Sequence, residues 1–348
     1  MKLLCICGPF AQKKKITCGQ EAKVNNIYRE LALVYSESNI YRINTDKSIL
    51  NILLLPFRIF YGLLISRNFL MLPSKKGIKV TTPFVMVFNE LFKRKLFYLV
   101  IGGWLRFFLE YNPSLKRMLL KFDGIFVETT TLKKQLMEIG FNNIFIMPNF
   151  KRIMILSDDC FYKTYEKPYK VCTFSRVDRN KGIEDAVKIV NDINKEYGED
   201  IYHLDIYGKI EKGQEEWFEK LKSEFDSSIK YVGLVDSEKT TEVLRDYFIL
   251  LFPTQYFTEG LPGTIIDAFS AGIPVVSSKW ESFEDVIDDN INGFGYEFNN
   301  VNEMRSILIR LAEDPNVVLK MKSQCIKKAR NYLPEEVVKV LTEKFAYE

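Results

Sequence analysis

Two segments in the second half of the chain carry residue types that can bind a phosphorylated ligand. In the first, 169–183, Arg176 and Lys181 follow an apolar run, and Gly182 leads into a helical pattern. Two cations at the carboxyl end of a strand suit a diphosphate, and they could neutralise charge that grows on a departing phosphate. A solvated basic loop is the alternative interpretation of this segment.

The second segment, 248–277, joins an apolar run to a glycine-rich turn. Five residues stand where the next helix should begin: Gly260, Leu261, Pro262, Gly263 and Thr264. Proline suits a first helical turn, glycine lets the backbone approach a ligand, and the N–H groups of a helix start attract phosphate. Glu259 precedes this turn, and Asp267 falls about one turn into the helix. An ordinary helix start with a solvated carboxylate is the alternative.

Other chemistries find less support in the sequence. There is no Gly-x-Gly-x-x-Gly or Walker A motif, which disfavours dinucleotide oxidoreductases and P-loop kinases. No D-x-D triplet indicates a carboxylate pair for Mg²⁺ or Mn²⁺. The six cysteines are scattered and His203 is the only histidine, which argues against a zinc site and against a His-dependent nucleophile. We therefore expect no metal and no cofactor, with phosphates held by N–H groups and cations.

The charge of the chain is divided unevenly. Residues 1–150 contain 22 Lys and Arg against 9 Asp and Glu, and residues 151–348 contain 27 against 36. A basic first half suggests that this half meets an anionic surface, either nucleic acid or a membrane. No nucleic-acid-binding module accompanies the charge, so we expect no nucleic acid as a partner.

An apolar stretch at 49–72 raises the question of a membrane span. It is interrupted by five residues: Pro56, Arg58, Gly62, Arg67 and Asn68. A spanning helix needs about 20 mainly apolar residues, and a central Arg costs about 2.5–3.5 kcal/mol. A buried helix followed by a strand, or an amphipathic surface that partly faces a membrane, is favoured over a spanning helix. Without an export signal pattern, a cytoplasmic protein that is peripheral at the inner face of the plasma membrane is expected.

Short apolar runs alternate with helical patterns along the chain. In the first half they predict strands at 2–7, 39–43, 68–72, 96–101, 123–127 and 143–147. Helices are predicted near 20–35, 48–65, 81–92, 113–120 and 129–139. Alternation of this kind predicts a parallel sheet covered on both faces.

The alternation starts again after a charged stretch at 151–168. Strands are predicted at 169–175, 202–207, 229–232, 248–252, 274–277 and 293–297. Helices are predicted at 182–195, 213–225, 237–246, 263–271, 301–313 and 315–331. The expected fold is α/β, with two Rossmann-like, doubly wound parallel-sheet domains that face each other across a cleft. Ligands should bind beyond the carboxyl ends of the strands.

Taken in order, the motifs resemble those of a known family. They read FSRVxxxKGI, EGLPGTxxDAFSAGIPVVS and DDNINGF, and all lie within 170–296. This order resembles the carboxyl domain of the family 4 retaining glycosyltransferases of the GT-B type, within the glycosyl transferases group 1. The resemblance extends over nearly the whole chain, more loosely before residue 120. The run VIGGWL at 100–105 is similar to enzymes of capsular and exopolysaccharide assembly.

The resemblance implies a division of the chain and a role for each part. Residues 1–150 would form the acceptor domain, 151–331 the nucleotide-sugar donor domain, and 332–348 a helix that crosses back to the first domain. Arg176 and Lys181 would bind the donor diphosphate and stabilise the leaving group. The other implied donor contacts are Glu259 to the sugar, Asp267 to the ribose, Gly19, Gly260, Leu261, Gly263 and Thr264 around the phosphates, and Tyr231 and Gly233 beside the base.

Two positions depart from the family pattern. The second acid of its E-x7-E motif is Asp267 here, whose carboxylate reaches one methylene less than that of Glu. Where the family usually has a His after its fourth strand, this chain has Gly102, Gly103 and Trp104 on the acceptor side. His203 falls in the other domain, within a strand, where we expect it to pack. A front-face mechanism, in which the leaving phosphate takes the proton of the acceptor, does not require that His.

The resemblance implies a retaining, metal-independent hexosyltransferase of bacterial surface polysaccharide synthesis, acting on a lipid-linked saccharide. Its basic first domain would be drawn to an anionic inner leaflet, at about 1 kcal/mol per nearby Lys or Arg. The basic clusters are Lys13, Lys14 and Lys15, then Lys75, Lys76 and Lys79, then Lys93, Arg94 and Lys95. Scattered solvated charge is the alternative for these clusters. Two other functions stay open for the chain: another GT-B reaction, such as nucleotide-sugar epimerisation or inverting transfer, and a non-catalytic scaffold of a polysaccharide assembly complex at the membrane.

Overall fold

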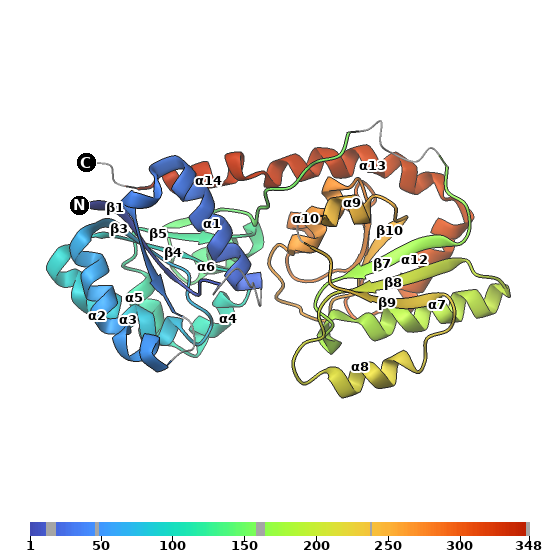
Figure 1. Ribbon diagram of the computed structural model, residues 1–348, viewed down its shortest axis with the longest axis horizontal. Helices are drawn as coiled ribbons and strands as arrows, with labels where there is room; N and C mark the ends of the chain where they lie inside the picture. Colours follow the sequence, from blue (N-terminus) through green and yellow to red (C-terminus); the bar gives the residue numbers. More distant parts are fainter. Residues whose placement is uncertain (12–18, 46–48, 158–163, 237–238, 346–348) are drawn as a thin grey trace. The chain divides into compact units, whose positions relative to one another are not determined.

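The computed structural model describes the chain apart from residues 12–18, 46–48, 158–163, 237–238 and 346–348. The chain divides into two compact units (Figure 1). The first contains Met1–Asn149 and Pro334–Glu348, and the second contains Phe150–Leu333. The basic cluster at 13–15 lies outside the described residues.

The first unit is built on a sheet of six parallel strands. They are β1 (Lys2–Gly8), β2 (Ile40–Asn44), β3 (Ser66–Met71), β4 (Lys95–Leu99), β5 (Gly124–Val127) and β6 (Ile144–Ile146). Their order in the sheet is β2-β1-β3-β4-β5-β6. The chain therefore leaves β1 toward one edge and returns on its other side at β3, so the direction of winding changes between these two strands.

Seven α-helices belong to the first unit within its described residues. They are α1 (Gly19–Tyr35), α2 (Ile49–Ile65), α3 (Ile78–Phe92), α4 (Leu105–Glu110), α5 (Pro113–Leu119), α6 (Thr130–Glu138) and α14 (Pro334–Thr342), with a 3₁₀ turn, η1 (Glu37–Asn39). The last helix contacts α1, and the ring of Phe345 beyond it lies 5.3 Å from the ring of Phe97 on β4. The carboxyl end of the described chain is thus part of the first unit.

The second unit repeats this architecture. Its parallel strands are β7 (Tyr169–Phe174), β8 (Tyr202–Tyr207), β9 (Ile229–Gly233), β10 (Ile249–Phe252), β11 (Val275–Ser278) and β12 (Gly293–Tyr296). Their order is β12-β11-β10-β7-β8-β9. The chain runs outward from β7 through β8 and β9, then returns to pair β10 with the free side of β7. Because β7 and β10 are neighbours, the loops that follow them start side by side at the carboxyl edge of the sheet.

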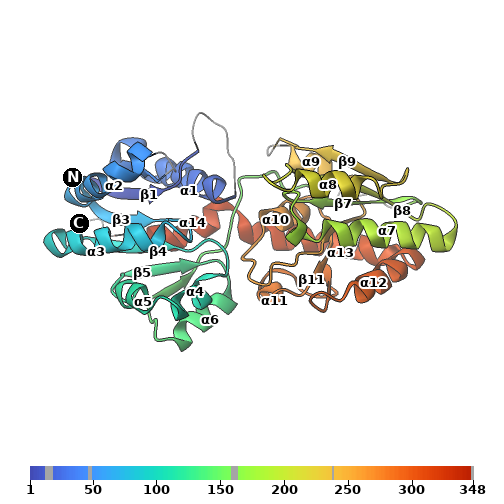
Figure 2. The same cartoon turned by 90° about the horizontal axis from the view of Figure 1, so that it is seen from below.

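Helices and short turns surround the second sheet (Figure 2). They are α7 (Ile183–Tyr197), α8 (Glu215–Lys222), α9 (Thr240–Leu244), α10 (Gly263–Ser270), α11 (Phe283–Val286), α12 (Val301–Glu313) and α13 (Asn316–Ala329), with the 3₁₀ turns η3 (Arg179–Lys181) and η4 (Arg330–Tyr332). Every residue of β10 and β11 is buried, as expected for parallel strands covered on both faces. The prediction of two doubly wound parallel sheets is confirmed.

The element boundaries differ from expectation in the first unit. Helix α3 begins at Ile78, before its internal proline Pro83, because Ile78, Thr82 and Val85 form one buried face with helical spacing. The short helix α4 was not expected, and it starts directly after Trp104. Among the described helices, none has both the length and the apolar content that crossing a bilayer requires.

Candidate active site

One glycine shapes the turn after β7. Gly182 has φ +67° and joins η3 to α7. A Cβ atom at this position would lie 1.8 Å from the carbonyl oxygen of Pro253, so the native backbone has room only for glycine. This close approach brings the loop after β7 against the loop after β10. The two loops meet at the topological switch point of the sheet, where folds of this kind bind their ligands.

The contact between these loops brings Lys181 and Glu259 together, although 78 residues separate them in the chain. Lys181 Nζ forms an ion pair with Glu259 Oε1, and the two side chains are 11% and 17% exposed. Thr254 Oγ1 donates a hydrogen bond of 3.2 Å to the same Glu259 oxygen. The cation and the carboxylate singled out in the sequence therefore form one mostly buried pair at the edge of the sheet.

Tyr256 lies between the charged groups of the two loops. Lys181 Nζ is 4.9 Å from the centre of its ring. Its hydroxyl donates to Asp178 Oδ2 and accepts from Asn180 Nδ2, both at 3.3 Å. Burial raises the pKa of the Tyr256 phenol, while the nearby charge of Arg176 acts to lower it. Tyr256 therefore contacts Lys181, and it lies close enough to Arg176 for that charge to affect the phenol. No sequence motif indicated this tyrosine.

Arg176 is the more exposed of the two cations. Its side chain is 45% exposed, and its Nη1 lies 2.5 Å from Glu211 Oε2 in the loop after β8. Burial acts to lower the pKa of Arg176, but the hydrogen bond and charge of Glu211 outweigh it and raise the pKa. Because Glu211 is itself 39% exposed, this ion pair contributes little to the stability of the fold. A competing anion can therefore replace Glu211 at Arg176.

The start of α10 presents hydrogen-bond donors. Pro262 precedes the helix and makes no side-chain cap, and the first N–H groups of a helix, here from Gly263 and Thr264, have no partner within it. Within the described residues, the buried hydroxyl of Thr264 also has no hydrogen-bond partner. Gly260 and Leu261 are buried beneath this turn. Donors at the positive end of a helix dipole suit a phosphate.

Asp267, predicted to contact a ribose, is buried in the second unit at 1% exposure. Its Oδ2 lies 2.5 Å from Lys151 Nζ, and its Oδ1 accepts a hydrogen bond of 3.3 Å from Thr240 Oγ1. A ribose hydroxyl that bound Asp267 would have to share these carboxylate oxygens with Lys151 and Thr240. Lys151 was not singled out in the sequence, because only the fold brings together residues that are 116 positions apart.

We expect the Lys151–Asp267 pair to stabilise the second unit. Lys151→Met leaves a buried carboxylate without its cation, which should lower the free energy of unfolding by about 3 kcal/mol. The comparison uses thermal unfolding of Lys151→Met, Asp267→Asn and the double variant, which measures the coupling of the two sites. The double variant should unfold at a higher temperature than Lys151→Met. If the losses in stability of the two single variants add up to that of the double variant, the ion pair contributes nothing to the free energy of unfolding.

The loops after β8 and β9 are tied to the loop after β7. A Cβ atom on Gly208 would lie 1.7 Å from the carbonyl oxygen of Ser175. Tyr231 donates from its hydroxyl to the Gly208 carbonyl at 2.9 Å, and Gly208 N–H donates to the Gly233 carbonyl at 2.8 Å. Tyr231 and Gly233, predicted to border a base, thus lie at the same carboxyl edge. His203, the second residue of β8, is at the opposite end of that strand. Its side chain is 41% exposed beside Asp200, so the expectation that it packs is wrong.

The predicted acceptor-side loop is fixed by a buried ion pair in the first unit. Lys23 on α1 pairs with Glu128 Oε1 after β5, and these residues are 4% and 6% exposed. The other oxygen of Glu128 accepts a hydrogen bond of 3.1 Å from the N–H of Gly102, whose φ is +82°. Gly103 is buried, and Trp104 is partly buried. Neither Lys23 nor Glu128 was indicated by a motif.

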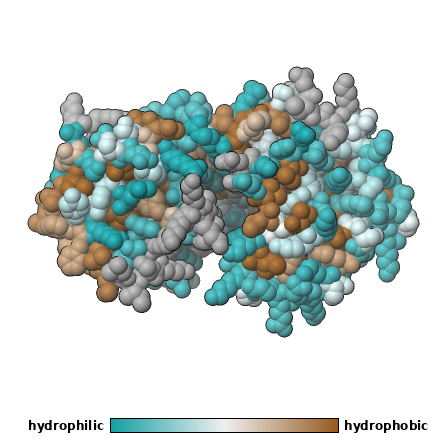
Figure 3. Space-filling view, viewed as in Figure 1, coloured by the Kyte–Doolittle hydropathy of each residue, from teal (hydrophilic) through white to brown (hydrophobic). Residues whose placement is uncertain are grey.

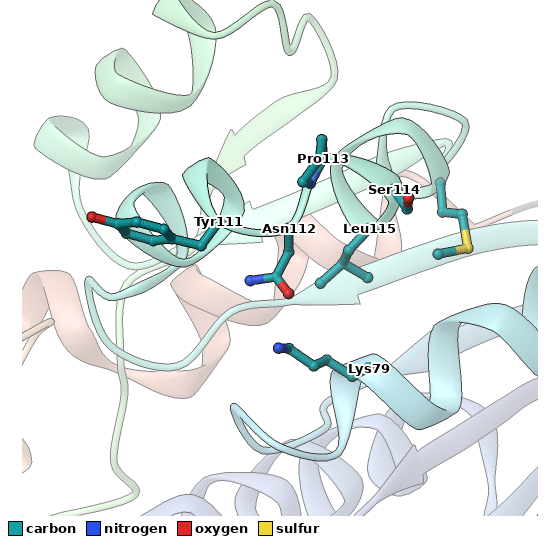
Figure 4. Close-up of a pocket in the computed structure, with 7 residues that line it drawn as sticks. Lys79, Tyr111, Asn112, Pro113, Ser114 and Leu115 are labelled. Carbon is teal, nitrogen blue, oxygen red and sulfur yellow. The ribbon is translucent and has the colours of Figure 1, made fainter.

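A pocket of about 300 Å³ lies in the first unit (Figure 4). It is lined by Lys79, Tyr111, Asn112, Pro113, Ser114, Leu115 and Met118. Figure 4 shows Asn112 and Leu115 directed toward the Lys79 ammonium group, and Tyr111 directed away from it. Lys79 Nζ also lies 5.0 Å from the ring centre of Phe108, whose ring packs edge-on against Trp104. The pocket is thereby linked to the predicted acceptor-side loop.

Gly19 is placed in the first unit, whereas the other predicted donor-side residues are in the second. It is exposed at the start of α1, and a Cβ atom there would meet no atom of the described residues within 4 Å. Packing against the described residues therefore does not require a glycine at this position. The missing side chain leaves the backbone open to a ligand.

Positive charge and hydrogen-bond donors are what the second unit offers to a ligand. Lys181 and Arg176 supply the charge, and the start of α10 supplies N–H groups and a hydroxyl that has no hydrogen-bond partner among the described residues. In the described part of the chain, no group of three or more His, Cys, Asp or Glu side chains could hold a metal ion. Such an arrangement can bind a diphosphate and stabilise negative charge that develops on it.

Comparison with known proteins agrees with this chemistry. The family model of the glycosyl transferases group 1 matches residues 159–332, which is half of the chain. An uncharacterized glycosyltransferase of Methanocaldococcus jannaschii is 24% identical over 294 residues, covering 80% of this chain and 69% of that protein. The amylovoran biosynthesis glycosyltransferase AmsK of Erwinia amylovora is 24% identical over 156 residues, covering 42% and 37% of the two chains.

A solved structure shows the same fold. The crystal structure of HepE from Anabaena in complex with UDP superimposes with a TM-score of 0.73 at 12% identity, over 99% of both chains. At this identity the likeness concerns the fold alone. Together with the two parallel six-stranded sheets, it confirms the expected GT-B architecture.

Proposed function

This chain belongs to the glycosyl transferases group 1, and on that premise we propose that it is a retaining, metal-independent glycosyltransferase that uses a nucleotide diphosphate sugar. The observation that carries the proposal is the Lys181–Glu259 pair at the switch point of the second sheet. A relative named for amylovoran biosynthesis supports a role in polysaccharide synthesis. We propose a family 4 enzyme of bacterial surface polysaccharide assembly, of the capsular or exopolysaccharide type.

In this proposal the second unit binds the donor. Lys181 and Arg176 hold the diphosphate, together with the N–H groups at the start of α10. Lys181 turns from Glu259 to the phosphate, and the freed carboxylate accepts hydrogen bonds from sugar hydroxyls. When the bond between the anomeric carbon and the phosphate oxygen breaks, the two cations stabilise the charge that remains on the diphosphate.

The acceptor hydroxyl attacks the face of the sugar from which the diphosphate departs. Its oxygen bonds to the anomeric carbon, and its proton passes to the leaving phosphate oxygen. The configuration is retained because the new bond forms on the face that the diphosphate leaves. This transfer needs no basic side chain in the first unit, where Gly102, Gly103 and Trp104 replace the usual His. The anomeric configuration of the product distinguishes this reaction from inverting transfer.

We propose that the first unit receives a lipid-linked saccharide at the cytoplasmic face of the membrane. The pocket beside Lys79 and the adjoining rings of Trp104 and Phe108 support this assignment, because aromatic faces and polar groups together suit a sugar. The ammonium groups of Lys75 and Lys79 are available to the phosphates of such a lipid.

Thermal unfolding in the presence of UDP, GDP, dTDP and CDP tests the donor site. Because a protein of the same fold binds UDP, we expect UDP to raise the unfolding temperature. A ligand at 100 times its Kd stabilises the folded state by about 2.7 kcal/mol. Arg176→Ala should reduce the shift, since it removes a charge-assisted hydrogen bond to phosphate.

Arg305→Ala is the matched control for this experiment. Arg305 pairs with Glu196 on the surface of the second unit, as Arg176 pairs with Glu211, but no part of the proposed site involves it. Its nucleotide shift should equal that of the wild type. No shift with any of the four nucleotides would overturn the donor site and favour a non-catalytic scaffold. A shift that Arg176→Ala preserves would remove Arg176 from the site.

A further inference from the structure

Exposed apolar side chains are concentrated on two neighbouring helices of the first unit. Of the 23 large apolar side chains that are exposed among the described residues, ten lie on α2 and α3. Figure 3 shows apolar side chains gathered at the edge of the unit where Figure 1 places these helices. Six of them define what we call the α2–α3 face: Leu53, Phe57 and Leu64 on α2, and Val80, Val87 and Leu91 on α3.

Helix α2 is apolar on both of its sides. Leu55, Ile59 and Leu63 are buried against the sheet with helical spacing. Leu53 and Phe57 follow the same spacing on the opposite side, where they are 66% and 73% exposed. A helix that is apolar all round belongs in a protein core or in lipid. Among the described residues, one side of α2 contacts the core, through Leu55, Ile59 and Leu63.

Helix α3 extends this exposed surface. Val80, Val87 and Leu91 recur at positions i, i+7 and i+11, which places them on one side of the helix. The ring of Phe60 on α2 lies 5.5 Å from that of Phe88 and 5.2 Å from that of Phe92, so the two helices pack directly together. The two exposed stripes therefore belong to one continuous layer.

The segment that forms this face is strongly basic. Residues 49–99 contain eight Lys and Arg and one acidic residue, Glu90. Lys75, Lys76 and Lys79 stand at the start of α3, and Lys93, Arg94 and Lys95 stand at its end. Arg94 also donates to the carbonyls of Leu63 and Leu64 at the end of α2. Cations therefore flank the apolar layer at both ends of α3.

We propose that the α2–α3 face docks on the surface of an anionic lipid bilayer. The apolar stripes enter the boundary between headgroups and acyl chains, and the flanking cations contact lipid phosphates. A second copy of the chain is disfavoured as the occupant, because two such faces would bring like charges together. The inference gives the lipid-linked acceptor of the proposed function a physical location, but it is carried by α2 and α3 and not by the donor site.

Co-sedimentation with vesicles tests this proposal. The full chain is mixed with vesicles of equal parts phosphatidylglycerol and phosphatidylcholine, and with vesicles of phosphatidylcholine alone. We expect binding to the anionic vesicles, weakened in about 1 M NaCl, where the Debye length falls to about 3 Å. A variant with Leu53, Phe57, Val87 and Leu91 all changed to Ser should bind at least about tenfold less, because its apolar insertion is lost.

A matched variant controls for the loss of apolar surface as such. It changes Leu33, Val34, Met137 and Ile291 to Ser; these residues are 51–72% exposed, and all lie outside α2 and α3. It should bind vesicles like the wild type. Equal binding of vesicles by both variants would overturn the proposal. It would also be overturned if the wild type formed a dimer without binding vesicles and the substitutions on the α2–α3 face dissociated that dimer. Both variants should keep the nucleotide-induced shift of the wild type, which shows that they are folded. Absence of that shift in the wild type would instead count against the proposed function.

Discussion

Replacing Lys181 by alanine is expected to lower kcat for sugar transfer by about 10²–10³-fold, the usual effect of removing one group that stabilises charge in the transition state. The Lys181 side chain is only 11% exposed, and its ammonium group lies at the switch point, beside Glu259 and Tyr256. In this position it is less screened by water than a surface lysine. The rate is measured as nucleotide diphosphate released from the donor sugar that the wild type uses.

Two further variants show whether the charge itself matters. Lys181→Arg keeps a cation at the site and should retain more activity than Lys181→Ala. Lys188→Ala removes an exposed lysine in the second turn of α7 and should behave like the wild type. Because the lost interaction strengthens in the transition state, kcat should fall more than KM rises. Turnover by Lys181→Ala within threefold of the wild type would exclude Lys181 from leaving-group stabilisation.

The fold could be predicted because its signals are local. Most strands are short apolar runs followed by a segment of helical pattern, so alternation along the chain was enough to predict parallel sheets. Lys181 and Glu259 could also be singled out, because each follows such a run and lies next to glycine. Their direct contact could not be predicted from the sequence, because it depends on β10 pairing with the free side of β7.

Residues without a local signal were missed for the same reason. Tyr256 acts through contacts with a loop 76 positions away, and Lys151 through a carboxylate 116 positions away. Glu128 holds the Gly102 loop from a different strand. In each case the side chain is ordinary for its place in the sequence. Its importance comes from which strands are neighbours in the sheet.

Gly182→Ala is expected to be among the most damaging single substitutions in the second unit. The new residue would have to adopt φ +67°, a strain of about 1–3 kcal/mol, and its Cβ would lie 1.8 Å from Pro253 O. Overpacking of this kind typically adds about 1–3 kcal/mol. Because unfolding temperature falls by about 2–4 °C per kcal/mol in a unit of this size, we expect a decrease on the order of 10 °C.

Gly198→Ala separates the strain from the clash. Gly198 caps the other end of α7 with the same φ of +67°, but a Cβ atom there would meet no atom of the described residues within 4 Å. It should therefore lose only the strain, about 1 kcal/mol, and keep its activity. In Gly182→Ala, relief of the clash must move the loop that carries Lys181 away from the loop that carries Glu259, so activity should fall at least about tenfold even below the unfolding temperature. Equal unfolding temperatures for the two variants would mean that the approach of Gly182 to Pro253 does not hold the loops together.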